Sequence, residues 1–297
     1  DILRRFNRSE KWISENGLPP NVFLRILLPM WSHYRMPSPI IVDKIVEIVK
    51  SLSAWPTLRV LDLSCGEGGV LEALHREGCR VEGTHFREDD YIIKKPMPVL
   101  SKIPIHKGVD LAQPLPFGDR LYDVIIATEV IEHLPSHSAF LSEAARMLKD
   151  QGYLILTTPN IHRLQSRLRF ALTGQHEMRS ARLGWDISRD DLYSTHHNPV
   201  YFPVIHTLLR HNSLRMVQTK FITCKAAAFL LLPFVPMIWI ATAVEARHSI
   251  KRSRQGGRDL LRWLNDIRLY FSDQLVIVAQ KGDIHPVFTG PPPAVSR

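Results

Sequence analysis

The sequence predicts an α/β fold built on a parallel, doubly wound sheet of seven strands, with helices on both faces. Short apolar segments alternate with segments of helical periodicity along most of the chain, and this alternation is typical of a parallel sheet. In addition, the strand predicted over 59–63 runs straight into a glycine-containing turn and a helix. Such a turn leaves backbone N–H groups free at the helix N-terminus, where a ligand can approach them.

The individual elements follow from the apolar pattern, taken in order. A helix begins at Ser38-Pro39, because serine caps a helix N-terminus and proline suits the first turn, and Ile41, Ile45 and Ile48 form its apolar stripe. Further helices are predicted over 70–75, 136–149 and 200–211. Strands are predicted over 59–63, 80–86, 103–109, 122–127, 153–158, 216–223 and 274–279.

These elements divide the chain into a core and several appended segments. Residues 55–224 and 273–284 form the core, and 159–199 is a polar, basic insertion on the substrate side. Residues 1–54 are a helical leader, which either forms a lid over the site or only packs on the core. Residues 225–272 form an apolar and basic hairpin, and 285–297 form a disordered tail.

The first turn has the pattern Asp62-x-x-Cys65-Gly66-x-Gly68, without the G-x-G-x-x-G spacing of dinucleotide sites. It resembles motif I of the class I methyltransferases that depend on S-adenosylmethionine (SAM), with Ser64 at the family's usual first glycine. The resemblance implies a Rossmann-like, seven-stranded class I methyltransferase sheet, and SAM as the cofactor.

The resemblance also implies a set of cofactor-binding residues at the carboxyl ends of the strands. His85 stands where the family has an acid that binds the ribose, so either this contact is weaker or Glu88 or Asp89 replaces it. Asp110 is at the place of the acid that faces adenine; the alternative is a turn-forming aspartate. The full set is Asp62, Ser64, Gly66, Gly68, His85, Asp110, Leu111, Thr128 and Glu129.

Glu129, Glu132 and His133 would share one face of a helix, since they are spaced i, i+3 and i+4. This Glu-x-x-Glu-His element resembles that of the ubiquinone-biosynthesis O-methyltransferases (the methyltransferase type 11/12 group). It also resembles the element of small-RNA terminal 2′-O-methyltransferases, which bind a divalent metal with a more distant histidine; His196 or His197 lies at a comparable distance.

Three interpretations of this element remain open. Glu129, Glu132, His133 and His196 could hold Mg²⁺ or another divalent ion, which would lower the pKa of a substrate hydroxyl. Without a metal, His133 or His196 is the general base, and carboxylates such as Glu132 orient it. In the third interpretation Glu129 touches the cofactor and the other residues only cap a helix.

The segment over 226–244 carries no charge and has about the length that spans a bilayer. A single span would separate the seventh strand from its sheet, and Pro233 and Pro236 interrupt helical hydrogen bonding. A membrane-associating hairpin satisfies both constraints, and a hairpin buried on the protein or on a second subunit is the alternative. Basic residues follow the apolar run, and an amphipathic helix then carries Leu260, Leu264, Ile267 and Phe271 along one side.

The net charge and the cysteine content indicate the kind of partner and the cellular compartment. The formal net charge of +9 and the pI near 9.6 favour an anionic partner, either a membrane surface or nucleic acid. Three cysteines form neither a disulfide framework nor a metal-spaced pair, which predicts a reducing, cytoplasmic compartment. Together with the hairpin, this predicts a protein that is peripheral or monotopic on the inner face of the membrane, and we expect a bacterial-type enzyme.

The expected function is SAM-dependent O-methylation of a hydroxyl on an amphipathic or lipid-linked acceptor, such as a quinone precursor or a glycolipid. Methylation of RNA ribose is the alternative, favoured by the basic charge, and a SAM-binding protein without catalysis is a third class. The sequence gives no indication of the oligomeric state.

Overall fold

The computed structural model describes residues 39–52, 55–86, 102–176, 196–224, 231–252 and 254–282. Most of the predicted leader, the two acids Glu88 and Asp89, the middle of the substrate-side insertion and the predicted tail lie outside these residues. The chain divides into two compact units, 1–35 and 36–297, and the description below concerns the second unit.

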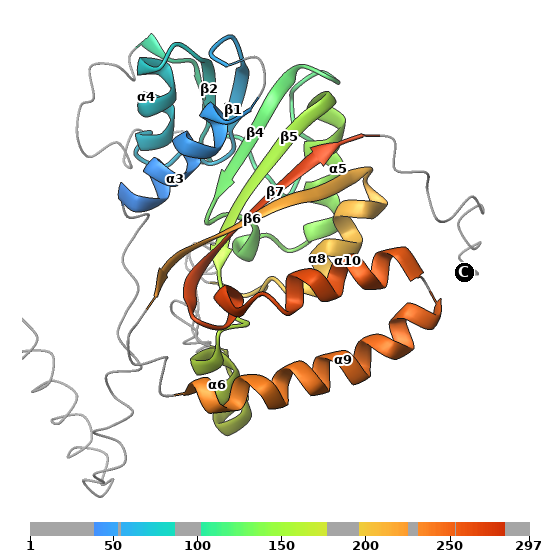
Figure 1. Cartoon of the computed structure of the whole chain (residues 1–297). Helices are drawn as coiled ribbons and strands as arrows, with labels where there is room; N and C mark the ends of the chain where they lie inside the picture. The colour runs from blue at the N-terminus through green and yellow to red at the C-terminus, as the bar shows by residue number, and fades with distance from the viewer. Residues whose placement is uncertain are drawn as a thin grey trace, which may run out of the picture. The chain divides into compact units, whose positions relative to one another are not determined.

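A seven-stranded sheet in the order β3-β2-β1-β4-β5-β7-β6 forms the centre of this unit (Figure 1). The strands are β1 (Arg59–Asp62), β2 (Arg80–Thr84), β3 (Ile105–His106), β4 (Tyr122–Thr128), β5 (Leu148–Pro159), β6 (Leu214–Cys224) and β7 (Ser272–Lys281). All pairs are parallel except those of β7, which runs antiparallel to both β5 and β6. The predicted α/β fold is confirmed, but the sheet is mixed, because the chain re-enters it beside the strand it has just left.

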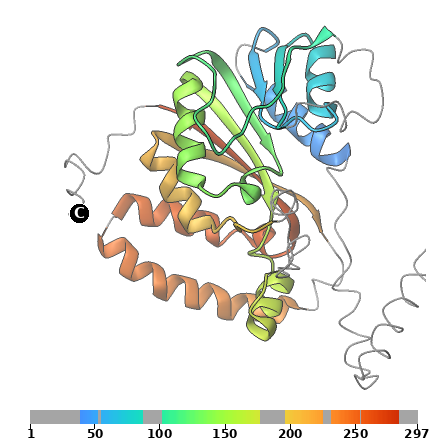
Figure 2. The same ribbon diagram turned by 180° about the vertical axis from the view of Figure 1, so that it is seen from behind.

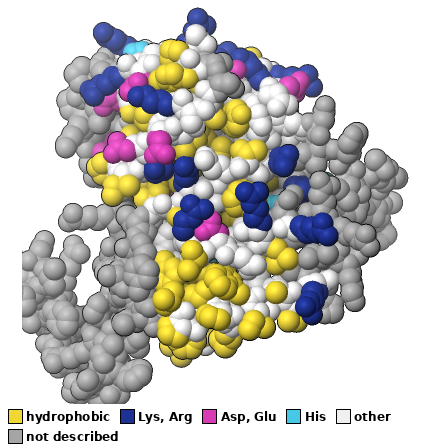
Figure 3. Space-filling view, viewed as in Figure 1, with side chains coloured by type: hydrophobic (Ala, Val, Ile, Leu, Met, Phe, Trp, Pro, Cys, Tyr) yellow, Lys and Arg dark blue, Asp and Glu magenta, His cyan; other side chains and the backbone are white. Residues whose placement is uncertain are grey.

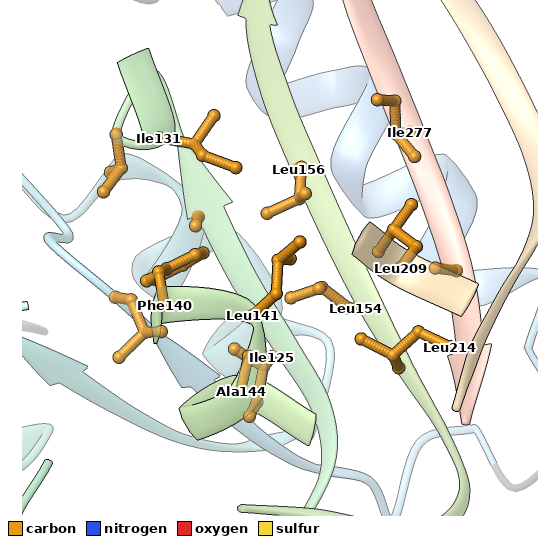
Figure 4. Packing of buried hydrophobic residues seen from close by; sticks show 14 of the residues in the cluster. Ile125, Ile131, Phe140, Leu141, Ala144, Leu154, Leu156, Leu209, Leu214 and Ile277 are labelled. Carbon is orange, nitrogen blue, oxygen red and sulfur yellow. The ribbon is translucent and has the colours of Figure 1, made fainter. Parts of the chain in front are cut away.

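Apolar side chains cover both faces of the sheet, since neighbouring strand residues point to opposite sides. On one face Val60, Val124 and Ile126 pack with α3 (Pro39–Lys50) and α4 (Gly69–Arg76). On the other face Ile125 and Leu154 pack with α5 (His137–Met147) and α8 (Phe202–His211), as Figures 2 and 4 show. Helices therefore lie on both faces, as the sequence predicts.

Two boundaries differ from the sequence prediction. The helix expected over 136–149 ends at Met147, and β5 begins at Leu148 with a break in its register to β4 between Tyr122 and Val124. The third strand is paired only over Ile105–His106, because β3 is a short edge strand. Neither difference moves the carboxyl ends of the central strands.

The segment between β6 and β7 contains two helices, α9 (Val235–Arg252) and α10 (Arg254–Leu264), followed by the short helix η6 (Ile267–Tyr270). Cys224 pairs with Ser272, so the chain leaves and re-enters the sheet at adjacent positions. Among the described residues, no helix combines the length and the apolar character that crossing a membrane requires.

The amphipathic helix predicted in this segment is shorter and is oriented toward the protein. It ends at Leu264, and Leu260 and Leu264 pack against the buried residues of the sheet. Phe271 lies beyond the helix and is buried, whereas Ile267 is exposed. The apolar side of α10 therefore packs toward the protein core and is partly buried there.

Candidate active site

The turn after β1 folds with left-handed backbone angles at Ser64 (φ 66°), Gly66 (φ 53°) and Gly68 (φ 78°). Thr84, the last residue of β2, holds it: its Oγ1 accepts a hydrogen bond of 2.9 Å from the Ser64 N–H, and its carbonyl accepts one of 3.0 Å from Cys65. Among the described residues, no atom lies within 4 Å of a Cβ built on Gly66, so the backbone there has open space beside it. This is the close approach that a ligand at a helix N-terminus requires.

Asp62 ends β1 directly before this turn, and its side chain is buried. Burial raises the pKa of its carboxyl group to about 7. Among the described residues, no group donates a hydrogen bond to its Oδ1. A buried acceptor of this kind is suited to a cationic or N–H donor of a ligand.

His85 and Asp110 follow the ends of β2 and β3. His85 is buried, and its backbone is fixed by hydrogen bonds to His106 (2.8 Å) and from Val109 (3.0 Å). Asp110 Oδ1 accepts a hydrogen bond of 2.9 Å from the N–H of Ala112, which gives this aspartate the turn-forming geometry. Leu111 beside it is buried.

Glu129, after β4, has a left-handed backbone (φ 54°). Thr157 of the neighbouring β5 holds it on both sides: the Thr157 hydroxyl accepts a hydrogen bond from the Glu129 N–H and donates one to Oε1, each 3.1 Å long. Thr128 before it carries a buried hydroxyl without a partner among the described residues. The left-handed turn directs the chain away from the sheet immediately after the strand.

Glu132, His133 and His196 form a compact group at this edge. One ligand atom of each lies within 4.8 Å of the others. The imidazole rings of His133 and His196 meet edge to face with their centroids 4.6 Å apart, and His196 Nε2 lies 3.9 Å from Glu132 Oε1. Glu132 and His196 are buried, and His133 is half-buried.

Asn198 fastens the two parts of this group together. Its N–H donates to the carbonyl of Glu132 (3.1 Å), and its side-chain amide donates to the carbonyl of Leu134 (2.8 Å). Burial raises the pKa of the Glu132 carboxyl well above its usual range, and the nearby Glu129 carboxylate raises it further. A cation or an imidazolium at this place would stabilise the ionised form of Glu132.

The common helical face required Glu129–His133 to be helical, and this condition is not met. Only Ile131–His133 is helical, as the single 3₁₀ turn η4, and Glu129 lies before it in the left-handed turn. Glu129 is consequently not part of the three-residue group. The histidine from the distant segment is His196; His197 does not belong to the group either.

Sequence reasoning missed three residues that position the others: Thr84, Thr157 and Asn198. The signal was present for each, because Thr84 and Thr157 are hydroxyl residues near the carboxyl ends of predicted strands. Asn198 follows the two histidines in sequence. The sequence pattern does not show that these three side chains form hydrogen bonds with neighbouring segments at the sheet edge.

The comparison with protein families decides the assignment. A model described as "Methyltransferase domain" matches residues 30–218, which is more than half of the chain. The chain belongs to this methyltransferase family. The sheet order and the glycine turn of the methyltransferase agree with that assignment.

Curated relatives match a shorter stretch of the methyltransferase. A ubiquinone biosynthesis O-methyltransferase from Bartonella quintana is 30% identical over 110 residues, covering 37% of this chain and 44% of the relative. One from Bradyrhizobium diazoefficiens is 32% identical over 112 residues, covering 38% and 44%. The matched stretch therefore spans less than half the length of these relatives.

Among solved structures, a SAM-dependent methyltransferase from Archaeoglobus fulgidus is similar to this fold. The TM-score is 0.51 at 17% identity, covering 88% of this chain and all of that one. The similarity concerns the fold. On the chain itself, the open space at Gly66 and the unpartnered Oδ1 of Asp62 fit a cofactor that places an amino-acid moiety beside the turn.

Proposed function

We propose that the enzyme methylates a hydroxyl oxygen of an amphipathic acceptor, such as a quinone precursor or a lipid-linked glycan. The observation that carries this proposal is the group of Glu132, His133 and His196, which lies after β4, the strand next to that of the glycine turn. A hydroxyl is a poor nucleophile until its proton is removed, and an imidazole held at the edge of the site is a suitable base. The names of the curated relatives support oxygen as the methylated atom.

In the proposed methyl transfer, one of the two histidines acts as the base and Glu132 supports it. SAM supplies a methyl group on a sulfonium, and this bond to sulfur breaks as the bond to the acceptor oxygen forms. The acceptor proton passes to His133 or His196, and the Glu132 carboxylate stabilises the resulting imidazolium. Positioning the oxygen in line with the methyl group provides much of the rate, so no covalent enzyme intermediate is required.

A metal-assisted form of the same reaction is the second candidate, because the three ligand atoms are close enough to surround one ion. One carboxylate and two imidazoles suit a transition-metal ion such as Fe²⁺ or Zn²⁺ better than Mg²⁺, which prefers oxygen ligands. The predicted ligand Glu129 is outside the group, which weakens the case for Mg²⁺ further. Metal analysis of the protein and assays in EDTA separate the two forms: full activity in EDTA with no metal bound contradicts the metal-assisted one.

The test is transfer of labelled methyl from SAM to extracts of the source cells, divided into lipid, RNA and small-molecule fractions. We expect label in lipid or in an apolar small molecule. Replacing the proposed base in H133Q or H196Q should slow transfer about 10²–10⁴-fold while SAM still binds. The variant H211Q, which changes an exposed histidine on α8, is the control. Label confined to RNA, or full activity in both H133Q and H196Q, would contradict the proposal.

A further inference from the structure

An apolar surface lies over α6 (Leu164–Thr173), α9 as far as Val244 and the residues just before α9; the two helices are far apart in sequence. Figure 3 shows hydrophobic side chains gathered there, with lysine and arginine side chains around them. We call this the α6–α9 surface. Its exposed members are Leu168, Phe170, Leu172, Leu232, Phe234, Met237, Trp239, Ile240 and Val244.

The two helices are neighbours because they share one buried cluster. Leu164 of α6 and Val235 of α9 pack together with Tyr270 and Phe271 in front of β7. α6 is buried only in its first turn and is mostly exposed from Leu168 onward, whereas α9 buries Val235 and exposes most of its later residues. On α9 the exposed side includes Met237 (61% exposed), Ile240 (67%) and Val244 (53%), which follow the i, i+3, i+7 spacing of one helical face.

The α6–α9 surface is attached to the edge that carries the candidate site. β5 pairs with β4 so that Thr157 lies opposite Thr128, and α6 starts shortly after β5 ends. A buried ion pair between Arg163 and Asp273 fixes the start of α6 to β7. The apolar surface therefore does not move independently of the carboxyl ends of the strands.

The charge around this surface is positive. α6 contains no acidic residue, and its two arginines, Arg167 and Arg169, are only partly exposed. Arg247 of α9 and Arg258 of α10 are exposed, and α9 has a single acid, Glu245, in its second half. An uncharged apolar segment followed by basic residues, with a tryptophan among the apolar ones, is the composition that suits the interface of an anionic bilayer.

We propose that the α6–α9 surface docks the enzyme on an anionic lipid bilayer, with Met237 and Ile240 entering the headgroup region. The biological purpose of this docking rests on the proposed function. An enzyme docked in this way would bind an amphipathic acceptor at the edge of the molecule that contacts the bilayer. It also narrows the membrane contact expected over 225–272, because α10 is turned toward the core while α9 keeps an exposed apolar face, and it adds α6 to that contact.

The test is flotation of the full chain with vesicles of phosphatidylcholine alone or mixed with phosphatidylglycerol. We expect binding to the mixed vesicles, weakened by salt, and weakened about tenfold or more in M237Q/I240Q because two apolar side chains no longer leave water. The matched control I40Q/V217Q changes exposed apolar residues on α3 and β6 and should bind like the wild type. R247Q/R258Q should lose most of the preference for phosphatidylglycerol.

Three results would overturn the inference. The first is a wild-type chain that does not float, and the second is equal binding by M237Q/I240Q and I40Q/V217Q. The third is a dimer in analytical ultracentrifugation that M237Q/I240Q dissociates, without flotation, because a second copy of the chain would then occupy the surface. A vesicle-free assay with a short-chain phenolic acceptor keeps the two proposals apart. Activity there without vesicle binding contradicts only the docking, and vesicle binding without methylation of any hydroxyl contradicts only the function.

Discussion

Asp62 and Glu132 carry buried carboxyl groups at the sheet edge, and among the described residues no hydrogen bond of ordinary geometry reaches Asp62 Oδ1 or either Glu132 oxygen. Leaving a buried charge without partners destabilises the folded state. In both cases burial raises the pKa of the group. The edge is therefore less stable than a core of the same size would be, and a bound cofactor or acceptor is the natural source of the missing partners.

The substitution D62N tests this for the glycine turn. The pKa of Asp62 is about 7 in the folded state, above its ordinary value of 3.8, so its carboxyl favours folding below pH 4 and this contribution is lost as pH rises through 7. Between pH 4 and pH 8 the free energy of unfolding should therefore fall less in D62N than in the wild type. The two decreases should differ by up to about 4 kcal/mol. Denaturant unfolding at several pH values measures this difference.

The same variant should bind SAM more weakly, because an amide oxygen attracts an ammonium group less than a carboxylate does. Calorimetry should show a loss of about tenfold in affinity at pH 8. Stability and cofactor affinity would then change in opposite directions. A D62N protein that binds SAM as tightly as the wild type would show that this carboxyl has only a structural part.

The residues of the glycine turn could be predicted because a tight strand-to-helix turn needs small side chains in consecutive positions. The arrangement around Glu129 could not, because helical spacing was assumed where the backbone turns left-handed at one residue. The partnership of His196 with Glu132 depends on Asn198 bridging to the η4 turn. No local pattern specifies such a contact between distant segments.

At the scale of elements, β2 is packed closely against the glycine turn and α4. A Cβ at Gly83 would lie 2.6 Å from Leu71 Cδ1 and 3.0 Å from both Cys65 Sγ and Ile105 Cδ1. Strand, turn and helix therefore meet without room for a single methyl group. The position of the turn depends on this contact as much as on its own glycines.

The substitution G83A should lower the free energy of unfolding by about 1–3 kcal/mol, since the added methyl group overpacks a filled interior. Urea denaturation measures the change. G69A is the matched control: Gly69 starts α4, and a Cβ there would meet only Val42 Cγ2, at 3.6 Å, which is ordinary contact. Equal stability of G83A and G69A would mean that β2 and α4 adjust freely.

Element boundaries were predicted best where burial on both sides makes a strand uniformly apolar, as in β4. They were predicted less well at β5, whose first residues were assigned to the preceding helix because Leu148 and Lys149 continue its helical spacing. The direction of α10 could not be predicted at all. An amphipathic helix has the same sequence pattern whether its apolar side faces a bilayer or a sheet.

At the scale of the whole molecule, stability should be highest in the middle of the sheet. β4 and β5 have a strand on each side and helices on both faces, whereas α9 rests on α10 and a small cluster. We expect amide hydrogens of β4 to exchange at least about a hundredfold more slowly than those of α9. Hydrogen exchange followed by mass spectrometry measures this, and an α9 as protected as β4 would contradict it.

The adjacency of Cys224 and Ser272 in the sheet has a consequence for how such enzymes diversify. The segment between these two residues is an insertion whose two ends are paired with each other in the sheet. The entropic cost of closing such a loop rises only slowly with its length. An insertion of another length could therefore replace this one without shifting the register of β7. A different segment could accordingly stand in place of α9 and α10 while β7 keeps its pairing to β5 and β6.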